Sequence, residues 1–122
     1  MRSVVILLAF LSGSVWGHQF TPTYPSLEYS FVKGVMKVEM QLFNARQDVD
    51  YFELSVFDEN WNSVAFATDS RIIPLSYLGK KNVTIYIREK DRYTVKYICS
   101  ESKILSTSQA TVISSKICSK IK

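Results

Sequence analysis

Apolar and polar residues alternate with a period of two along much of this chain. The clearest case is residues 36–42, which read Met-Lys-Val-Glu-Met-Gln-Leu. Such alternation is typical of a β-strand with one face in a core and the other in solvent. The same period recurs in residues 51–57 and 82–88. The pattern therefore predicts half-buried strands of an antiparallel sheet.

Shorter apolar stretches between turn residues predict the remaining strands. They are Ser26–Val32, Val64–Phe66, Arg71–Leu75 (with Pro74 indicating an edge strand) and two arms within residues 93–122. No window has a helical period. Strands separated by turn signals at intervals of about 8–12 residues predict an all-β fold, an Ig-like antiparallel β-sandwich of seven or eight strands with a long C-terminal hairpin.

The N-terminus has the pattern of a secretory signal peptide. A short positive start at Arg2 precedes the apolar run Val4–Leu11, and Gly17 offers a small residue at which cleavage can occur. We expect residues 1–17 to be a signal peptide and residues 18–122 a single Ig-like domain in the periplasm or secreted. The alternative is an N-terminal core strand. The apolar run is shorter than the ~20 residues that span a bilayer, so no membrane span is predicted.

The C-terminal hairpin contains both cysteines, Cys99 and Cys118. In an oxidising compartment two cysteines predict one disulfide. If they face each other, counting places Glu101 opposite Lys116, an opposite-charge pair that stabilises a ladder. The same register puts Ser102 opposite Ser115, Lys96 opposite Ile121, Lys103 opposite Ser114, Ile104 opposite Ile113 and Leu105 opposite Val112, with the turn near Thr107–Gln109.

Charge is distributed unevenly along the expected mature domain. Residues 18–87 carry six basic and eight acidic side chains, whereas residues 88–122 carry eight basic and three acidic ones. Lysines commonly keep exposed edge strands soluble, and an acidic partner is the alternative explanation. Export and the small net charge argue against a nucleic-acid partner.

Candidate catalytic and metal-ligating residues are sparse. His18 is the only histidine, which disfavours Cys/His zinc sites and leaves a serine triad without a base unless His18 serves. Cleavage after Gly17 would expose His18 at the N-terminus, where we expect a frayed end rather than a copper site. The acidic pairs Asp48/Asp50 and Asp58/Glu59 are typical of solvated turns. The sequence predicts no enzyme, no cofactor and no metal site. Asn82-Val83-Thr84 is a glycosylation sequon, relevant only in a eukaryotic secretory pathway.

The order of these features resembles the N-terminal Ig-like domain of periplasmic pilus-assembly chaperones. The matching segments are Leu42–Asn44, Tyr51–Asp58, Phe66–Thr68, Ile72–Leu75, Leu78–Gly79, Ile85–Arg88 and Lys116–Lys122. More faintly, the chain is similar to small exported Ig-like proteins encoded by marine tailed phages. In the chaperones, a first-strand arginine and a last-strand lysine anchor a subunit's carboxylate. Lys116 matches the lysine, whereas Glu28-Tyr29-Ser30 stands at the arginine position.

The resemblance implies that the last strand is offered to a protein partner by strand pairing. The residues expected to contact the partner are Ile113, Lys116, Ile117, Lys120 and Ile121. We therefore predict an exported, non-enzymatic, chaperone-like binding module. The alternative is a structural or adhesion component of a surface or virion assembly that interacts through its sandwich faces.

Overall fold

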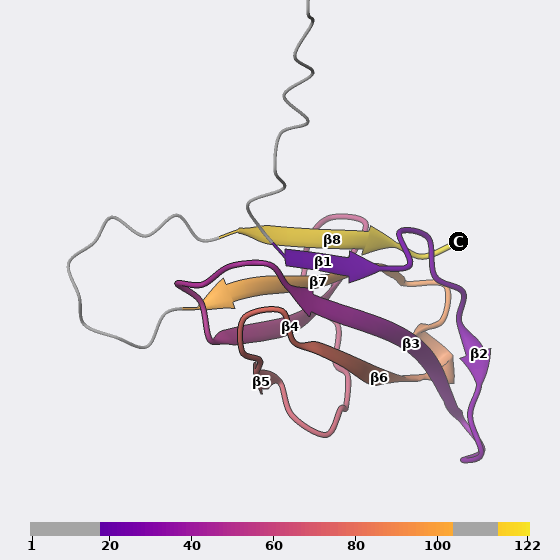
Figure 1. Cartoon of the computed structure of the whole chain (residues 1–122). Coiled ribbons are helices and arrows are strands. Elements are labelled where there is room, and N and C mark those ends of the chain that lie inside the picture. Colours follow the sequence, from indigo (N-terminus) through magenta and orange to yellow (C-terminus); the bar gives the residue numbers. More distant parts are fainter. Residues whose placement is uncertain (1–17, 104–114) are drawn as a thin grey trace, which may run out of the picture.

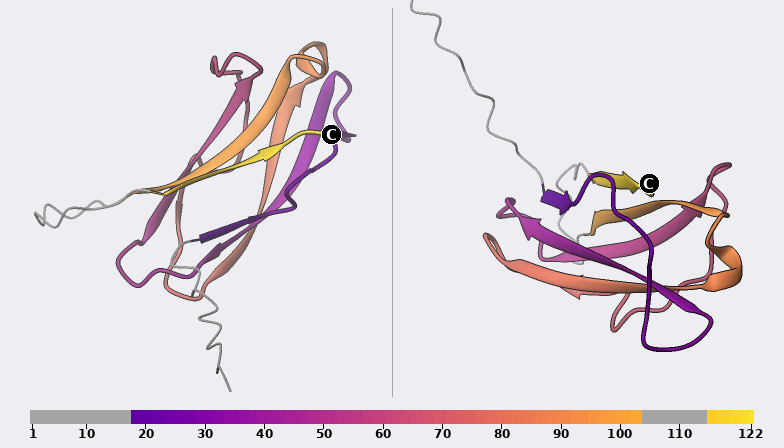
Figure 2. Two further views of the ribbon diagram at one scale, coloured as in Figure 1. Left: turned by 90° about the horizontal axis from the view of Figure 1, so that it is seen from above. Right: turned by 90° about the vertical axis from the view of Figure 1, so that its right-hand side faces the viewer.

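Two antiparallel sheets pack face to face in the computed structural model, which describes residues 18–103 and 115–122 (Figures 1 and 2). In the first sheet, β3 (Val35–Asn44) pairs with β6 (Lys80–Arg88) on one side and with β1 (His18–Thr21) and β2 (Glu28–Tyr29) on the other. The second sheet has the order β5 (Ile72–Pro74), β4 (Tyr51–Asp58), β7 (Val95–Lys103), β8 (Lys116–Lys120). A 3-10 turn, η1 (Glu89–Asp91), joins β6 to β7. The predicted Ig-like sandwich is confirmed.

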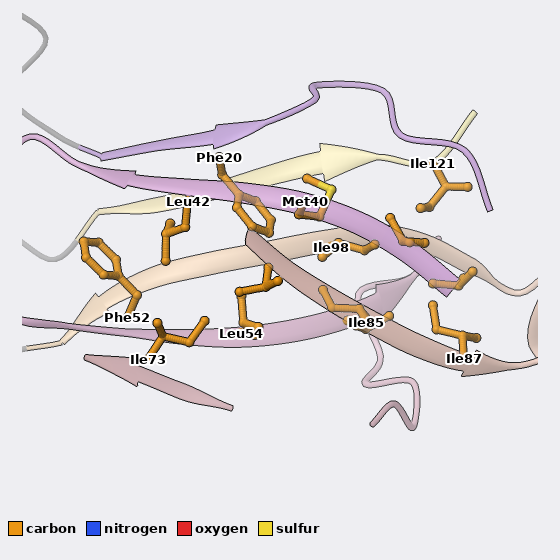
Figure 3. Packing of buried hydrophobic residues seen from close by; sticks show 14 of the residues in the cluster. Phe20, Met40, Leu42, Phe52, Leu54, Ile73, Ile85, Ile87, Ile98 and Ile121 are labelled. Carbon is orange, nitrogen blue, oxygen red and sulfur yellow. The ribbon is translucent and has the colours of Figure 1, made fainter. Parts of the chain in front are cut away.

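The core lies between the two sheets and follows the predicted alternation. The four apolar residues of 36–42 are all buried on β3, and the polar residues between them face outward. β4 contributes Phe52, Leu54 and Val56 to the same layer, and β6 and β7 supply further isoleucines (Figure 3). Each strand thus buries every second side chain, which is the arrangement that burial of apolar area favours in a two-sheet sandwich.

Two predicted strands differ from the structure. Only Glu28–Tyr29 of the expected strand Ser26–Val32 is paired, and both residues are exposed, so no apolar face holds a longer strand there. Val64–Phe66 is not a strand. It lies between two isolated bridges, Phe57 to Ser63 and Ala67 to Tyr86.

No strand was predicted between Gly17 and Ser26, but His18–Thr21 form β1. His18 pairs opposite Asn44, and Thr21 pairs opposite Gln41. Phe20 alternates inward and is buried in the core. The strand is short because Pro22 follows it, and proline has no N–H to extend a ladder. The prediction of an edge strand at Pro74 is confirmed, because β5 is the outermost strand of the second sheet.

Candidate functional site

β8 is the outermost strand of the second sheet on the side opposite β5, and its pairing with β7 follows the predicted register (Figure 1). Cys99 lies opposite Cys118, and Glu101 lies opposite Lys116. Beyond the ends of the strand, the Ser102 N–H donates to the Ser115 carbonyl (2.9 Å) and the Ile121 N–H donates to the Lys96 carbonyl (2.8 Å). The predicted pairs that involve residues 104–114 lie outside the described residues, as does the predicted turn.

The two cysteines form the expected disulfide. Their Cα atoms are 4.0 Å apart, and the two residues are 19 positions apart in the sequence. Backbone hydrogen bonds join Ser102 to Ser115 and Ile121 to Lys96, three pairs away on each side. Because hydrogen-bonded pairs alternate along an antiparallel ladder, Cys99–Cys118 is a non-hydrogen-bonded pair, the kind in which side chains approach most closely. Because both cysteines belong to one sheet, the bond joins neighbouring strands rather than the two layers.

The outer edge of β8 is only partly covered. Odd-numbered residues of this strand direct their N–H groups toward β7, so those of Lys116 and Cys118 point away from it. Further along, the N–H of Lys120 donates to the Thr23 carbonyl (3.1 Å) and that of Lys122 donates to the Pro25 carbonyl (3.0 Å). Within the described residues, no backbone group accepts from Lys116 or Cys118. β1 also lies alongside this strand (Figure 1).

The side chains expected to contact a partner face two directions. Lys116 and Lys120 are exposed on the outer face, and the Lys116 ammonium lies 4.5 Å from the centre of the Phe57 ring. Ile117 is partly buried against the core, and Ile121 is only 9% exposed within it. Ile121 therefore packs inside the sandwich instead of being presented at the surface. Ile113 lies outside the described residues.

A buried polar cluster lies beneath the β7–β8 hairpin, and we call it the hairpin-base cluster. It consists of His18, Ser100, Ser102 and Ser115. The His18 ring is within hydrogen-bonding distance of the Ser115 hydroxyl (Nδ1 to Oγ, 3.0 Å) and of the Ser100 hydroxyl (Nε2 to Oγ, 2.8 Å). The Ser115 N–H donates to the Ser102 hydroxyl (2.8 Å). The ring also packs on Phe52, with centroids 4.7 Å apart.

His18 is therefore not the frayed terminus that we expected. Its side chain is buried, and burial is the main cause that lowers its pKa, with the nearby Arg46 guanidinium acting in the same direction. Neutral imidazole is the form that desolvation favours. A single histidine followed by two prolines carries no pattern that indicates such a position. In the described part of the chain, the cluster has no carboxylate orienting the ring, so it does not form a nucleophilic triad.

Asn44 occupies the position opposite His18 and fixes the neighbouring loops. Its side-chain amide donates to the carbonyls of Val49 (2.7 Å) and Leu75 (2.9 Å). Its side-chain carbonyl accepts from the Arg46 N–H (2.8 Å). All polar atoms of this fully buried amide are thus bonded, which is what burial of a polar group requires.

The outer face of the second sheet presents an aromatic group beside β8. Trp61 stacks on Tyr97, with centroids 4.1 Å apart and planes 7° from parallel, and its ring lies 5.7 Å from that of Phe57. The turn that carries Trp61 is held by the Asp58 carboxylate, which accepts from the N–H groups of Asn60 and Asn62. Trp61 has a φ of 63°, which is rare for a bulky residue, and half of its surface is exposed.

In the described ranges, no three side chains of the His, Cys, Asp and Glu types gather in a way that could hold a metal ion. No helix among the described residues is long and apolar enough to cross a membrane. The β8 edge offers backbone hydrogen bonding, lysine charge and aromatic contact.

Comparison with known proteins finds solved structures that share this fold. No protein-family model matches the sequence, and no curated protein matches it. The E. coli chaperone DraB has a TM-score of 0.66 at 15% identity, over 87% of this chain and 54% of that one. A structure of the Salmonella enterica SafA pilin in complex with the SafB chaperone gives 0.63 at 12% identity, over 88% and 54%. The PapD-like domain 7 of human CEP192 gives 0.59 at 12% identity, over 99% and 94%.

These likenesses confirm the expected resemblance to pilus-assembly chaperones at the level of the fold. The chain spans about half the length of the two bacterial chains that it matches. At such low identities a shared fold carries no shared activity, because one fold supports many functions. The functional argument therefore rests on the geometry of the β8 edge.

Proposed function

We propose that this protein is an exported, non-enzymatic binding module whose β8 edge pairs with an extended segment of a protein partner. The observation that carries the proposal is the pair of outward backbone N–H groups at Lys116 and Cys118 on an outermost strand. An edge with unpaired backbone groups is a template for another strand. Likeness in fold to a chaperone crystallised with a pilin supports a protein as the partner.

Export rests on two observations. The disulfide is a bond that persists in oxidising compartments. The second is the signal-peptide pattern of residues 1–17, in which an apolar run follows a short positive start. We expect mass spectrometry of the exported chain to find His18 at its N-terminus. An N-terminus at Met1 would overturn the signal-peptide part of the proposal without affecting strand pairing.

Two substitutions at one position test strand pairing. Lys116→Pro removes the outward N–H but leaves the ladder to β7 intact, because that ladder uses the odd-numbered residues. Lys116→Ala keeps the N–H and removes only the ammonium. We expect capture of partners from the exported proteins of the producing cells to be lost in K116P and retained in K116A. The amides of Lys116 and Cys118 should also become protected from hydrogen exchange in the complex.

The outcomes of this pair separate three mechanisms. Equal loss in both variants would indicate that the ammonium anchors the partner, as the chaperone resemblance implies for a subunit carboxylate. Retention in both would exclude pairing at this edge. Circular dichroism and a mass measurement of the intact disulfide are the controls for folding.

A second candidate is an assembly component that binds through a sandwich face, and the Trp61–Tyr97 stack favours it. The exposed half of Trp61 is held in a strained backbone conformation, and such strain commonly accompanies a site of interaction. Trp61→Asn suits the positive φ better than tryptophan does and removes the ring. Loss of capture or of particle association in this variant, with K116P unaffected, would favour the face over the edge.

A further inference from the structure

The tip of the β2–β3 hairpin, residues 30–34, is a rigid protruding turn (Figure 1). The Ser30 hydroxyl donates to the Val35 carbonyl (2.7 Å) and accepts from the Val32 N–H (3.1 Å). Gly34 closes the turn at a φ of 84°, a conformation that only glycine adopts freely. The Gly34 carbonyl accepts from the Glu89 N–H (2.8 Å), which ties the tip to η1.

This well-held turn exposes its two largest apolar side chains. Phe31 is fully exposed, with 104% of the accessible surface that it would have in an extended chain, and Val32 is 61% exposed. A solvated phenylalanine and valine side by side on a fixed backbone gain free energy when a partner removes them from water. The turn projects beyond the strands that it joins (Figure 1), so these two side chains can enter an apolar layer ahead of the rest of the domain.

Amphipathic aromatic side chains lie behind the tip. Tyr29 and Tyr93 are both largely exposed, and the Arg92 guanidinium donates to both hydroxyls, at 3.0 Å in the case of Tyr29. These two hydrogen bonds, with that to Tyr93 the stronger cause, raise the pKa of Arg92. An apolar ring with a polar end beside a cation is the composition that proteins place at the headgroup level of a bilayer.

The charges around the tip complement an anionic surface. Residues 30–34 carry one lysine and no acid. Behind them four acidic side chains lie near three basic ones, with Lys37 shared by two of the acids. The pairs are Glu39 with Lys37 (3.4 Å), Asp91 with Arg88 (2.8 Å), Glu89 with Arg92 (3.9 Å) and Glu28 opposite Lys37 across the ladder. Within the described residues, Lys33 and Lys90 have no acid partner within ion-pair distance.

We propose that the β2–β3 tip inserts Phe31 and Val32 into the interfacial region of an anionic membrane. Lys33 reaches the lipid phosphates by extending its stem along the apolar side chains, as long cationic side chains do at interfaces. Lys37, whose ammonium lies 5.8 Å from the Phe31 ring centre, lies behind the inserted ring. Two inserted side chains give weak and reversible attachment, which suits a module that also binds a partner at a separate edge.

Sedimentation with vesicles tests the proposal on the exported chain, with its N-terminus determined by mass spectrometry and identical in every variant. The probe is vesicles of equal parts phosphatidylglycerol and phosphatidylcholine. We expect Phe31→Asp to lower the partition coefficient by about tenfold or more, because it removes the inserted ring and adds a repelled charge. Phe31→Trp should retain binding. Addition of vesicles should shift its tryptophan emission further to the blue than that of the wild type.

A matched control is Ile72→Asp, which replaces an exposed apolar residue of β5, an edge strand of the second sheet, and should leave vesicle binding unchanged. Wild-type binding should fall as NaCl is raised to about 1 M, where the screening length is about 3 Å, and should be weaker on pure phosphatidylcholine. Equal binding by wild type and F31D, or an unshifted F31W emission, would overturn the proposal. So would self-association that F31D abolishes in light scattering, because a second copy would then be the occupant.

Discussion

The two strands of the N-terminal segment, β1 and β2, both pair with β3 but differ in the burial of their side chains. β1 pairs with one end of β3 and buries His18 in the hairpin-base cluster, whereas β2 pairs with the other end and leaves both of its residues exposed. At the hairpin base, hydrogen bonds and a disulfide fix the position of β8. At the tip, the Ser30 hydroxyl and a hydrogen bond to η1 hold the turn, and its apolar side chains remain in water. One end therefore specifies the structure, and the other is left available for contact.

Among the predicted changes, removal of the disulfide should have the largest effect, and it should act on the hairpin base. Closure of a loop of this length contributes about 3 kcal/mol in the chain-entropy model, so Cys99→Ser with Cys118→Ser should lower the Tm by roughly 10–20 °C. Thermal unfolding with and without reductant measures this change in Tm. An unchanged midpoint would mean that the hairpin-base cluster alone holds β8 in place.

Asn44→Ala tests whether the amide opposite His18 is as important as its hydrogen bonds suggest. The substitution leaves the carbonyls of Val49 and Leu75 and the N–H of Arg46 without their partner. We expect a loss of about 2–3 kcal/mol in the free energy of unfolding, measured in urea. The matched control is Gln41→Ala, which removes an exposed amide bonded to Asn82 and should cost less than about 0.5 kcal/mol.

Acid should loosen the hairpin base and spare the tip. Burial lowers the pKa of His18 in the folded state below its unfolded value of 6.5, so the unfolded chain binds more protons as the pH falls. Stability is therefore complete above about pH 6.5 and declines as the pH falls below it. His18→Gln should remove this dependence in urea titrations between pH 5 and 7, since the chain has no other histidine. A profile shared by both proteins would assign the decline to carboxylates.

Ser119→Ala should produce a small change of opposite sign. The Ser119 hydroxyl is buried on the inner face of β8 and has no hydrogen-bond partner among the described residues. Replacing it removes a desolvation cost without opening a large cavity, so we expect stabilisation of up to about 1 kcal/mol. Destabilisation would indicate that the hydroxyl bonds to water or to a group outside the described residues.

Phe31→Ser at the tip should have the smallest effect on stability. The side chain is fully exposed, so the free energy of unfolding should change by less than about 0.5 kcal/mol. The same variant should lose vesicle binding if the tip inserts into membranes. A loss of stability comparable to that of Asn44→Ala would show that the two ends do not differ as described.

The sequence was informative where one local pattern determined the result. The alternation in β3 predicted its buried face, and a single assumption, that Cys99 faces Cys118, gave the register of β7 and β8 by counting. The direction in which Ile121 faces did not follow from the sequence, and in the structure it packs into the core. An apolar side chain on an edge strand can face inward or outward, and only the position of the other sheet decides.

The hairpin-base cluster could not be predicted, for a different physical reason. Its members come from distant parts of the chain, with His18 and Ser115 separated by 97 residues. Isolated serines and one histidine have no periodicity, so their proximity depends on tertiary packing. The tip was missed because Ser26–Val32 has strand-like composition, yet no described residue covers Phe31 and Val32 to hold them in a ladder.

The position of the disulfide has a mechanical consequence. A load applied to β8, for instance by a bound segment being pulled away, would normally peel a short edge strand by breaking its hydrogen bonds one at a time. The Cys99–Cys118 bond gives that load a covalent route into β7, which is itself paired with β4. Peeling must then stop at the staple, and further extension requires shearing an interior strand. The outermost strand thereby resists a pulling force as an interior strand does.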